Sequence, residues 1–287
     1  MVDEMNVRER VRAVLDGNMP DRIPQLIYQN FLPRGSFERE LRNMGLGVDV
    51  HCSVHVTESP GVEQESREAD GYEITEITTP AGKLRSRRKM NMTFQNPGGS
   101  WRVEHFVKTV EDLQVLNYMI EAEVHQPSRK DYQRLDSELE GDGIVTVGTT
   151  RTPLMYLVVH FLGYRTFSIM LHRHPEALME TVAILDRNFA EVNQIVAESP
   201  AEIVWIPDNI DEVLMSPKIF EKHCLPYYEK YTSILHRGGK KVISHMDGRL
   251  RSLKELIGST NLDAIEAFTP PPMGNLPVSG AREAWPD

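Results

Sequence analysis

Hydrophobic and polar positions along the chain follow two patterns that alternate from the N-terminus onward. Apolar residues at every third or fourth position predict helices, and short unbroken apolar runs predict buried strands. The helix expected at 6–15 shows the helical spacing, with Val7 and Val11 on one face and Asn6 as its N-terminal cap. The short, mostly apolar run Gly143–Gly148 predicts a buried strand. Strands that alternate with helices predict an α/β protein with a parallel sheet.

The remaining elements continue this alternation. Core strands are also expected at 25–29, 202–206, 242–244 and 264–267, about six in all, and helices at 37–44, 111–122, 129–139, 153–161, 164–172, 175–197, 216–236, 250–257 and 278–284. A closed (β/α)₈ barrel has eight strands, so either the last two units are missing or the count is short. The end of the chain at Asp287, within the pattern, favours the first alternative. We expect a single TIM-type barrel domain over residues 1–287 that lacks its last units.

Residues 50–107 depart from this pattern. Strict alternation in Tyr72–Ile77, the turn Thr79–Gly82 and the basic strand Lys83–Met90 predict an antiparallel β-hairpin. A second turn is expected at Asn96–Gly99. We expect the whole stretch to be a hairpin insertion in the barrel domain.

Composition excludes several classes of partner. The formal net charge is −10 and no strongly basic block is present, which argues against nucleic acid and against an anionic membrane surface. The longest apolar run, Pro153–Gly163, is too short to span a bilayer, and Met1–Arg12 has no apolar signal-peptide core. Cys52 and Cys224 form neither a disulfide framework nor a metal knuckle. We expect a cytoplasmic protein.

The candidate chemistry begins at the end of the strand Val242–Ser244, which is followed by His245, Met246, Asp247 and Gly248. His245 and Asp247 are two residues apart, so on an ideal strand they project to the same side. That spacing suits two ligands of one metal ion or an acid–base pair. Alternatively, Asp247 caps the next helix and His245 is a satisfied histidine beneath a loop.

Polar residues also follow the other strands, and in a barrel all of these ends meet at one mouth. Asp208, His245, Asp247 and Glu266 come from three consecutive strands and could surround one ion, for which Zn²⁺ suits the nitrogen and oxygen ligands best. Asp208 and Asn209 could instead form an Asx turn. The candidate site comprises catalytic Asp208, His245 and Glu266; metal-binding His245, Asp247 and Glu266; and substrate-binding Tyr28, Asn30, Arg151 and Asn209.

Three further histidines carry weaker signals. His160 lies in an apolar helix, which is the usual setting of a satisfied core histidine. His51 and His55 share one face of an extended segment, but without nearby acids they do not predict a metal site.

Several segments, in the same order along most of the chain, resemble the uroporphyrinogen decarboxylase superfamily. They are Asn18–Pro24, Thr152–Leu154 with Leu162 and Gly163, Ser216 and Pro217 with Phe220 and Leu225–Tyr227, His245 with Gly248, and Leu262–Ile265. The resemblance implies a (β/α)₈ barrel. It also implies one of two activities: a cofactor-free decarboxylase of heme synthesis, or a cobalamin-dependent methyltransferase that uses zinc.

The chain departs from the decarboxylase pattern. An Arg-Gln-Ala-Gly-Arg motif that grips the substrate's carboxylates is replaced by Tyr28–Gly35, where only Arg34 could serve. The decarboxylase's tyrosine before the glycine is Val159 here, and its aspartate after the second strand has no clear counterpart in His51–His55. The resemblance is therefore closer to the methyltransferase branch.

The methyltransferases hold zinc with a His-x-Cys pair and a further cysteine near the C-terminus. Here the pair is His245 and Asp247, and the region of the last cysteine lies beyond Asp287. An aspartate makes the site harder and richer in oxygen, which leaves room for activating an alcohol, an ether or water, or for another divalent metal.

The expected function is metal-assisted methyl transfer between a small O- or S-methyl compound and a corrinoid (cobalamin) carried by a partner protein, with Zn²⁺ as the metal. One alternative is a carboxy-lyase that acts on a tetrapyrrole or another acidic substrate. The other is an inactive barrel that binds a tetrapyrrole or a partner. The expected partners are a small-molecule substrate and a corrinoid protein, with a homodimer left open and with no nucleic acid and no membrane.

Overall fold

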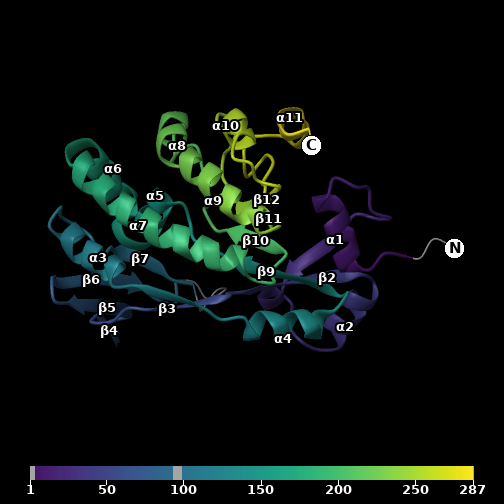
Figure 1. Ribbon diagram of the computed structural model, residues 1–287, viewed down its shortest axis with the longest axis horizontal. Helices are drawn as coiled ribbons and strands as arrows, with labels where there is room; N and C mark the ends of the chain where they lie inside the picture. The colour runs from purple at the N-terminus through teal and green to yellow at the C-terminus, as the bar shows by residue number, and fades with distance from the viewer. Residues whose placement is uncertain (1–3, 93–98, 287) are drawn as a thin grey trace. The chain divides into compact units, whose positions relative to one another are not determined.

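The computed structural model describes residues 4–92 and 99–286, and the chain divides into two compact units. The first unit comprises Met1–Val56, Gln126–Thr150 and Val192–Asp287, and the second comprises Thr57–His125 and Arg151–Glu191. A six-stranded parallel sheet lies in the first unit and a four-stranded antiparallel sheet in the second (Figure 1). The expectation of a single domain over residues 1–287 stays a prediction.

The sheet of the first unit is parallel throughout, as the alternation of strands and helices predicts. Its order is β1 (Gln25–Tyr28), β2 (Leu46–Cys52), β9 (Gly143–Gly148), β10 (Ile203–Ile206), β11 (Lys241–His245) and β12 (Ala264–Glu266). The helices of this unit are α1 (Val7–Leu15), α2 (Ser36–Asn43), α4 (Lys130–Leu139), α8 (Pro217–His223), α9 (Leu225–Arg237), α10 (Lys254–Gly258) and α11 (Val278–Ala284). The α/β class is confirmed, as are the strands expected at 25–29, 143–148, 202–206, 242–244 and 264–267, whereas the position of the sixth strand, β2, was not predicted.

Helix α1 begins where its sequence predicts. The Asn6 side chain accepts a hydrogen bond from the backbone N–H of Glu9 at 2.9 Å, and the Glu9 carboxylate accepts one from Asn6 N–H at 2.8 Å. This capping box satisfies two donors that the first turn leaves open. On the buried side, Arg10 donates two hydrogen bonds to Asp21, at 2.6 and 2.9 Å, and these contacts hold the loop into β1.

Two hydrophobic clusters lie on opposite faces of the parallel sheet. On one face Val11, Ile144, Ile203 and Ile243 pack together beneath α1. On the other, Leu32, Val48 and Val50 pack with leucines of α2 and α4. Successive residues of a strand point to opposite faces, so β2 contributes Val48 and Val50 to one face and Asp49 and His51 to the other. This alternation separates the two cavities described below.

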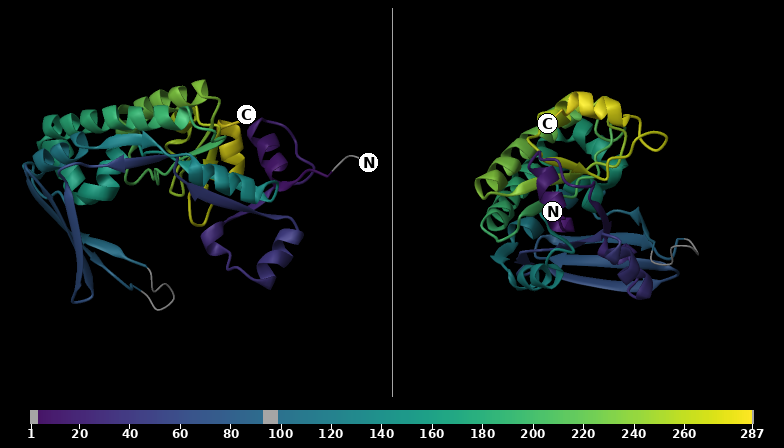
Figure 2. Two further views of the ribbon diagram at one scale, coloured as in Figure 1. Left: turned by 60° about the horizontal axis from the view of Figure 1, so that its bottom comes forward. Right: turned by 90° about the vertical axis from the view of Figure 1, so that its right-hand side faces the viewer.

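The second unit contains the expected hairpins. Strands β4 (Glu63–Ala69), β5 (Tyr72–Thr79), β6 (Gly82–Lys89) and β7 (Trp101–Glu104) pair antiparallel in that order, shown in blue in Figure 2. Ile77 and Leu84 lie opposite each other in the register and are buried. The turn expected at Asn96–Gly99 lies largely outside the described residues. Helix α3 (Asp112–Glu121) contacts β5 and β6.

Two further strands were not expected from the sequence. Strands β3 (His55–Glu58) and β8 (Val124–Pro127) form a separate two-stranded sheet. Their residues are mostly exposed and lack the apolar runs that predict a buried strand. Local pattern alone therefore does not indicate them.

An apolar helical stretch runs through Pro153–Arg173 as α5 (Pro153–Tyr156), a π-helical segment (Leu157–Leu162) and α6 (Gly163–Arg173). A break near Gly163 was expected and is confirmed, because the π-helical segment ends at Leu162 and Gly163 has φ +64° and ψ 164°, outside the helical region. A Cβ at Gly163 would lie 2.4 Å from the His105 ring, so only glycine fits. Within the described residues this stretch is long and apolar enough to cross a membrane by length and composition alone, and half of its most apolar part is buried inside the protein. Helix α7 (Pro175–Ala197) follows; its residues up to Glu191 belong to the second unit and the rest to the first.

Candidate functional site

Side chains at the C-terminal ends of the parallel strands converge on one cavity of the first unit. Tyr28 ends β1, His51 comes near the end of β2, Trp205 near the end of β10, and His245 and Glu266 end β11 and β12. The strand registers pair Tyr28 with Asp49 and His245 with Glu266. The cavity measures about 500 Å³ and is lined by Tyr28, Gln29, Asn30, Phe31, Asp49, His51, Trp205, Asn209 and His245. We refer to it as the mouth cavity.

Glu266 is the carboxylate on which the site is built. Its Oε1 accepts a hydrogen bond from the Tyr28 hydroxyl, and its Oε2 accepts from Trp205 Nε1 at 3.2 Å and contacts His245 Nδ1. Burial alone would raise the pKa of Glu266, but hydrogen bonds from His245, Tyr28 and Trp205 outweigh it and lower that pKa. Glu266 is therefore held ionised in a partly buried position.

His245 lies between two carboxylates. The hydrogen bond to Glu266 raises the pKa of His245 despite the opposing effect of burial, and the charge of Asp247 adds to the increase. The His245 Nε2 atom is 3.5 Å from Asp247 Oδ2, and the two side chains are 18% and 46% exposed. Nδ1 contacts the mostly buried Glu266, whereas Nε2 lies near the more exposed Asp247. A histidine fixed in this way presents Nε2 for a proton or a metal ion.

The donor set fits part of a divalent metal site. His245 Nε2 and Asp247 Oδ2 supply the imidazole nitrogen and carboxylate oxygen that Zn²⁺ accepts. Glu266 contacts the other ring nitrogen, which is the position of a carboxylate that orients a metal-binding histidine. Among residues 4–92 and 99–286, no group of three His, Cys, Asp or Glu side chains is arranged for a metal ion. The metal stays a prediction.

Sequence reasoning missed Asp49, His51 and Trp205. The His51 ring packs against Tyr28 and Trp205 at centroid distances of 5.0 and 4.7 Å. Its Nε2 lies 3.2 Å from Asp49 Oδ2, and the buried Asp49 Oδ1 has no hydrogen-bond partner among the described residues. The available signal was the spacing of Asp49 and His51, which puts an acid on the same strand face as the histidine. Trp205 lies in an apolar run, where an aromatic residue indicates core.

The turn that carries Asp247 is fixed by the loop after β10. A Cβ at Gly248 would lie 2.5 Å from Asp211 Cβ and 2.6 Å from the Ile210 carbonyl oxygen, so only glycine allows this approach. Asp211 accepts a hydrogen bond from the backbone N–H of Arg249 at 2.9 Å. Asp211 therefore holds the loop, and α10 begins seven positions after Asp247, at Lys254, so Asp247 does not cap it.

The other predicted residues fall into two groups. Asn30 and Asn209 line the mouth cavity beside Tyr28 and His245. Asp208 is 0% exposed and does not line that cavity. Burial, followed by the charge of Asp208, raises the pKa of Tyr228, so Asp208 lies in the interior next to that tyrosine.

Arg151 belongs to the second unit, and its role in substrate binding stays a prediction. Its Nε donates a hydrogen bond to His160 Nε2 at 3.4 Å. Burial, followed by the charges of Arg151 and Arg102, lowers the pKa of His160 to about 4. His160 is therefore a neutral, partnered histidine, as its apolar helix suggested.

Six parallel strands that follow one another in chain order, with a histidine and acids at their C-terminal ends, are typical of an α/β barrel, in which such ends form active sites. The sequence model of the family described as Uroporphyrinogen decarboxylase (URO-D) matches residues 88–268, and the chain belongs to this family. The family membership expected from the sequence is thus confirmed.

Comparison with solved structures finds a similar fold in a methyltransferase from Methanosarcina mazei. The TM-score is 0.50 at 14% sequence identity, and the alignment covers 91% of this chain and 76% of that chain. At this identity the likeness shows the fold alone. Curated proteins give no significant match.

Proposed function

We propose that this protein catalyses metal-assisted methyl transfer between a small O- or S-methyl compound and a corrinoid carried by a partner protein. The observation that carries the proposal is the orientation of His245. Glu266 occupies its Nδ1, so its Nε2 lies beside the exposed carboxylate of Asp247 at the mouth cavity. The likeness to a methyltransferase fold supports the same branch. The six parallel strands correspond, in this proposal, to six of the eight strands of a barrel.

Each side chain has a distinct task in this proposal. A divalent metal held by His245 Nε2 and Asp247 would supply Lewis-acid polarisation of the substrate's oxygen or sulfur. Glu266 holds the His245 ring in one orientation and in the tautomer with hydrogen on Nδ1. Tyr28 and Trp205 hold Glu266 in turn through the two hydrogen bonds they donate. The aromatic rings beside the cavity limit the access of water to the reacting group.

Metal content tests the proposal directly. We expect the wild-type protein to bind about one divalent ion per chain, His245→Ala to lose it, and Asp247→Ala to bind it at least tenfold more weakly. His172→Ala, which removes an exposed histidine, is the matched control. Methyl transfer to free cob(I)alamin, followed by its absorption spectrum, should fall in parallel. Metal binding that is unchanged in His245→Ala would overturn the proposal.

One observation favours the carboxy-lyase alternative. The raised pKa of His245, caused first by its hydrogen bond to Glu266, makes it a proton donor for the carbon atom that loses carbon dioxide. Asp49, which lines the same cavity, and Asp247 and Glu266, which contact His245, oppose the binding of an acidic substrate. Release of carbon dioxide from uroporphyrinogen by metal-free protein would support this alternative over methyl transfer.

A further inference from the structure

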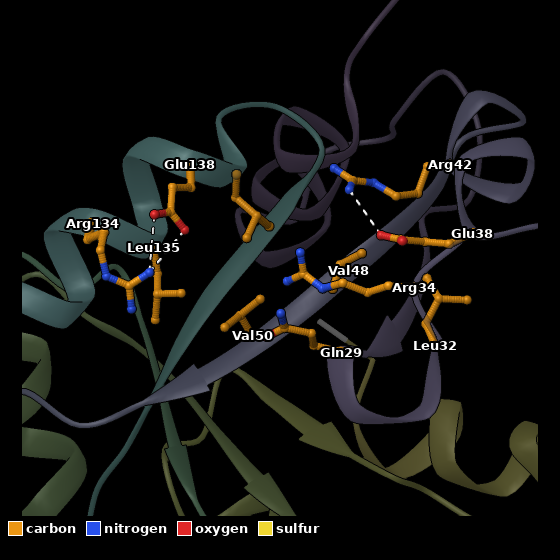
Figure 3. Close-up of a pocket in the computed structure, with 11 residues that line it drawn as sticks. Gln29, Leu32, Arg34, Glu38, Arg42, Val48, Val50, Arg134, Leu135 and Glu138 are labelled. Carbon is orange, nitrogen blue, oxygen red and sulfur yellow. Dashed lines mark hydrogen bonds and ion pairs between the residues drawn. The ribbon is translucent and has the colours of Figure 1, made fainter. Parts of the chain in front are cut away.

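A second cavity lies on the opposite face of β2 from the mouth cavity. It measures about 400 Å³ and lies between β2, α2 and α4 (Figure 3). Val48 and Val50 face it, whereas Asp49 and His51 face the mouth cavity. Three arginines, Arg34, Arg42 and Arg134, also line it, and we call it the arginine pocket. Neither the fold nor the proposed methyl transfer requires such a pocket.

The three arginines differ in their partners. Arg42 Nη2 lies 2.6 Å from Asp142, with a weaker contact to Glu38 at 3.4 Å. Arg134 pairs with Glu138 at 3.1 Å, one helical turn further along α4. Arg34 makes no hydrogen bond or ion pair with any residue that the structure describes. Glu38 and Glu138, the two acids that line the pocket, therefore contact Arg42 and Arg134, whereas Arg34 pairs with no acid among the described residues.

Figure 3 shows where the charge of Arg34 points. The Arg34 guanidinium lies in the middle of the pocket, between Arg42 on one side and the amide of Gln29 on the other. Arg42 already contacts Glu38 and Asp142, so Arg34 is the guanidinium that can bind an anion in this pocket. The Gln29 amide can donate a further hydrogen bond to such an anion.

The floor of the arginine pocket is apolar. Leu32, Val48 and Val50 are buried there, and Leu135 and Leu139 of α4 pack against them. An inorganic anion would leave this surface uncovered, because it has no apolar part. A ligand that carries both an anionic group and a hydrocarbon body would satisfy the guanidinium and cover the floor at once.

We propose that the arginine pocket binds a small carboxylate with an apolar chain or ring. The planar carboxylate matches the guanidinium of Arg34, which can donate two parallel hydrogen bonds to it. The hydrocarbon part lies on Leu32, Val48 and Val50. The charge of Arg34 opposes the binding of a cationic ligand. The site lies on the other face of β2 from His245 and takes no part in the chemistry there.

Calorimetric titration of the 287-residue chain with octanoate, butyrate and acetate tests this proposal. We expect octanoate to bind, and affinity to fall about fourfold for each methylene group that no longer contacts the floor. Octan-1-ol and octylamine, which share the chain but lack the carboxylate, should bind at least tenfold more weakly. Equal affinity for octanoate and octan-1-ol would overturn the proposal, as would the absence of octanoate binding at millimolar concentration.

Variants of the two exposed arginines on this side locate the site. Arg34→Gln keeps the polar character and should lower octanoate affinity at least tenfold. Arg39→Gln is the matched control, because Arg39 is exposed on α2 and does not line the pocket. Both variants should retain the far-ultraviolet circular dichroism and metal content of the wild type. Octanoate affinity unchanged in Arg34→Gln would assign the binding elsewhere and refute the proposal.

Discussion

The two faces of β2 carry cavities of opposite chemistry. On the face of the mouth cavity, Glu266 accepts hydrogen bonds from Tyr28 and Trp205 and contacts His245. On the face of the arginine pocket, Arg34 has no partner among the described residues. The difference shows two ways of preparing a site. In the first cavity, hydrogen bonds within the protein fix the side chains before a ligand binds. In the second, one guanidinium has no protein partner and can bind a ligand directly.

Glu266 offers the strongest test of the organised side. Glu266→Gln keeps the shape but removes the negative charge, so His245 loses the partner that orients it. We expect metal affinity to fall about 10- to 100-fold, because orienting carboxylates contribute this much, and methyl transfer to cob(I)alamin to fall at least as far. Glu255→Gln, which changes a glutamate with a 79% exposed side chain, is the control. If both quantities equalled those of the wild type, Glu266 would have no orienting role.

Variants of His51 test whether the packed rings of Tyr28, His51 and Trp205 contribute to activity. His51→Ala removes a ring that packs between Tyr28 and Trp205, and we expect kcat/KM to fall about tenfold as these side chains shift. His51→Phe keeps the ring without the contact to Asp49, so recovery in this variant would assign the effect to packing. His55→Ala is the control. An unchanged kcat/KM in His51→Ala would exclude His51 from the site.

A variant of Gly248 tests whether close packing against the loop after β10 is needed for the turn that carries Asp247. Gly248→Ala places a Cβ against Asp211 and the Ile210 carbonyl, and we expect it to lower the free energy of unfolding by about 1–3 kcal/mol. Chemical denaturation measures this loss. Gly258→Ala is the control, because its Cβ would make only an ordinary contact with Trp285 at 3.4 Å. Equal stability of the two variants would show that the loop adapts.

Arg10 provides a paired arginine to compare with Arg34. Its hydrogen bond is the main cause that lowers the pKa of Asp21 from 3.8 to about 2. A lowered carboxyl pKa stabilises the folded state above the ordinary value, and that contribution is lost as the pH falls through the folded value. Asp21→Asn should therefore melt several degrees below the wild type at neutral pH, with the gap closing between pH 3.8 and about 2. Asp70→Asn, at an exposed turn, should show no such gap; a gap independent of pH in Asp21→Asn would contradict the assignment.

Much of the fold could be predicted from the sequence because its elements follow local rules. The strand Gly143–Gly148 and the helix at 278–284 have the expected bounds. The start of β2 at Leu46 was not predicted, because Gly45 and Gly47 look like the end of the preceding helix. A Cβ at Gly47 would lie 2.2 Å from Val7, so this glycine serves packing rather than a turn.

The candidate site could be predicted only in part. Tyr28, His245 and Glu266 come together because the ends of parallel strands share one edge of the sheet. Asp208 follows the same rule in the sequence, but it lies two positions beyond β10 and is buried in the interior. Arg34 was considered as a carboxylate-binding residue of the mouth, yet it lines the cavity on the other face. The direction of a loop side chain depends on tertiary packing, which no local pattern records.

The 3₁₀ turn Gln29–Phe31 lies between the mouth cavity and the arginine pocket. Gln29 borders both cavities, and its neighbours Asn30 and Phe31 border the mouth cavity. A ligand that binds in one cavity and moves this turn changes the volume of the other cavity. Thermodynamic reciprocity then requires each ligand to alter the other's affinity by the same factor. Ligand binding in the arginine pocket and ligand binding in the mouth cavity would then be coupled through this one short turn.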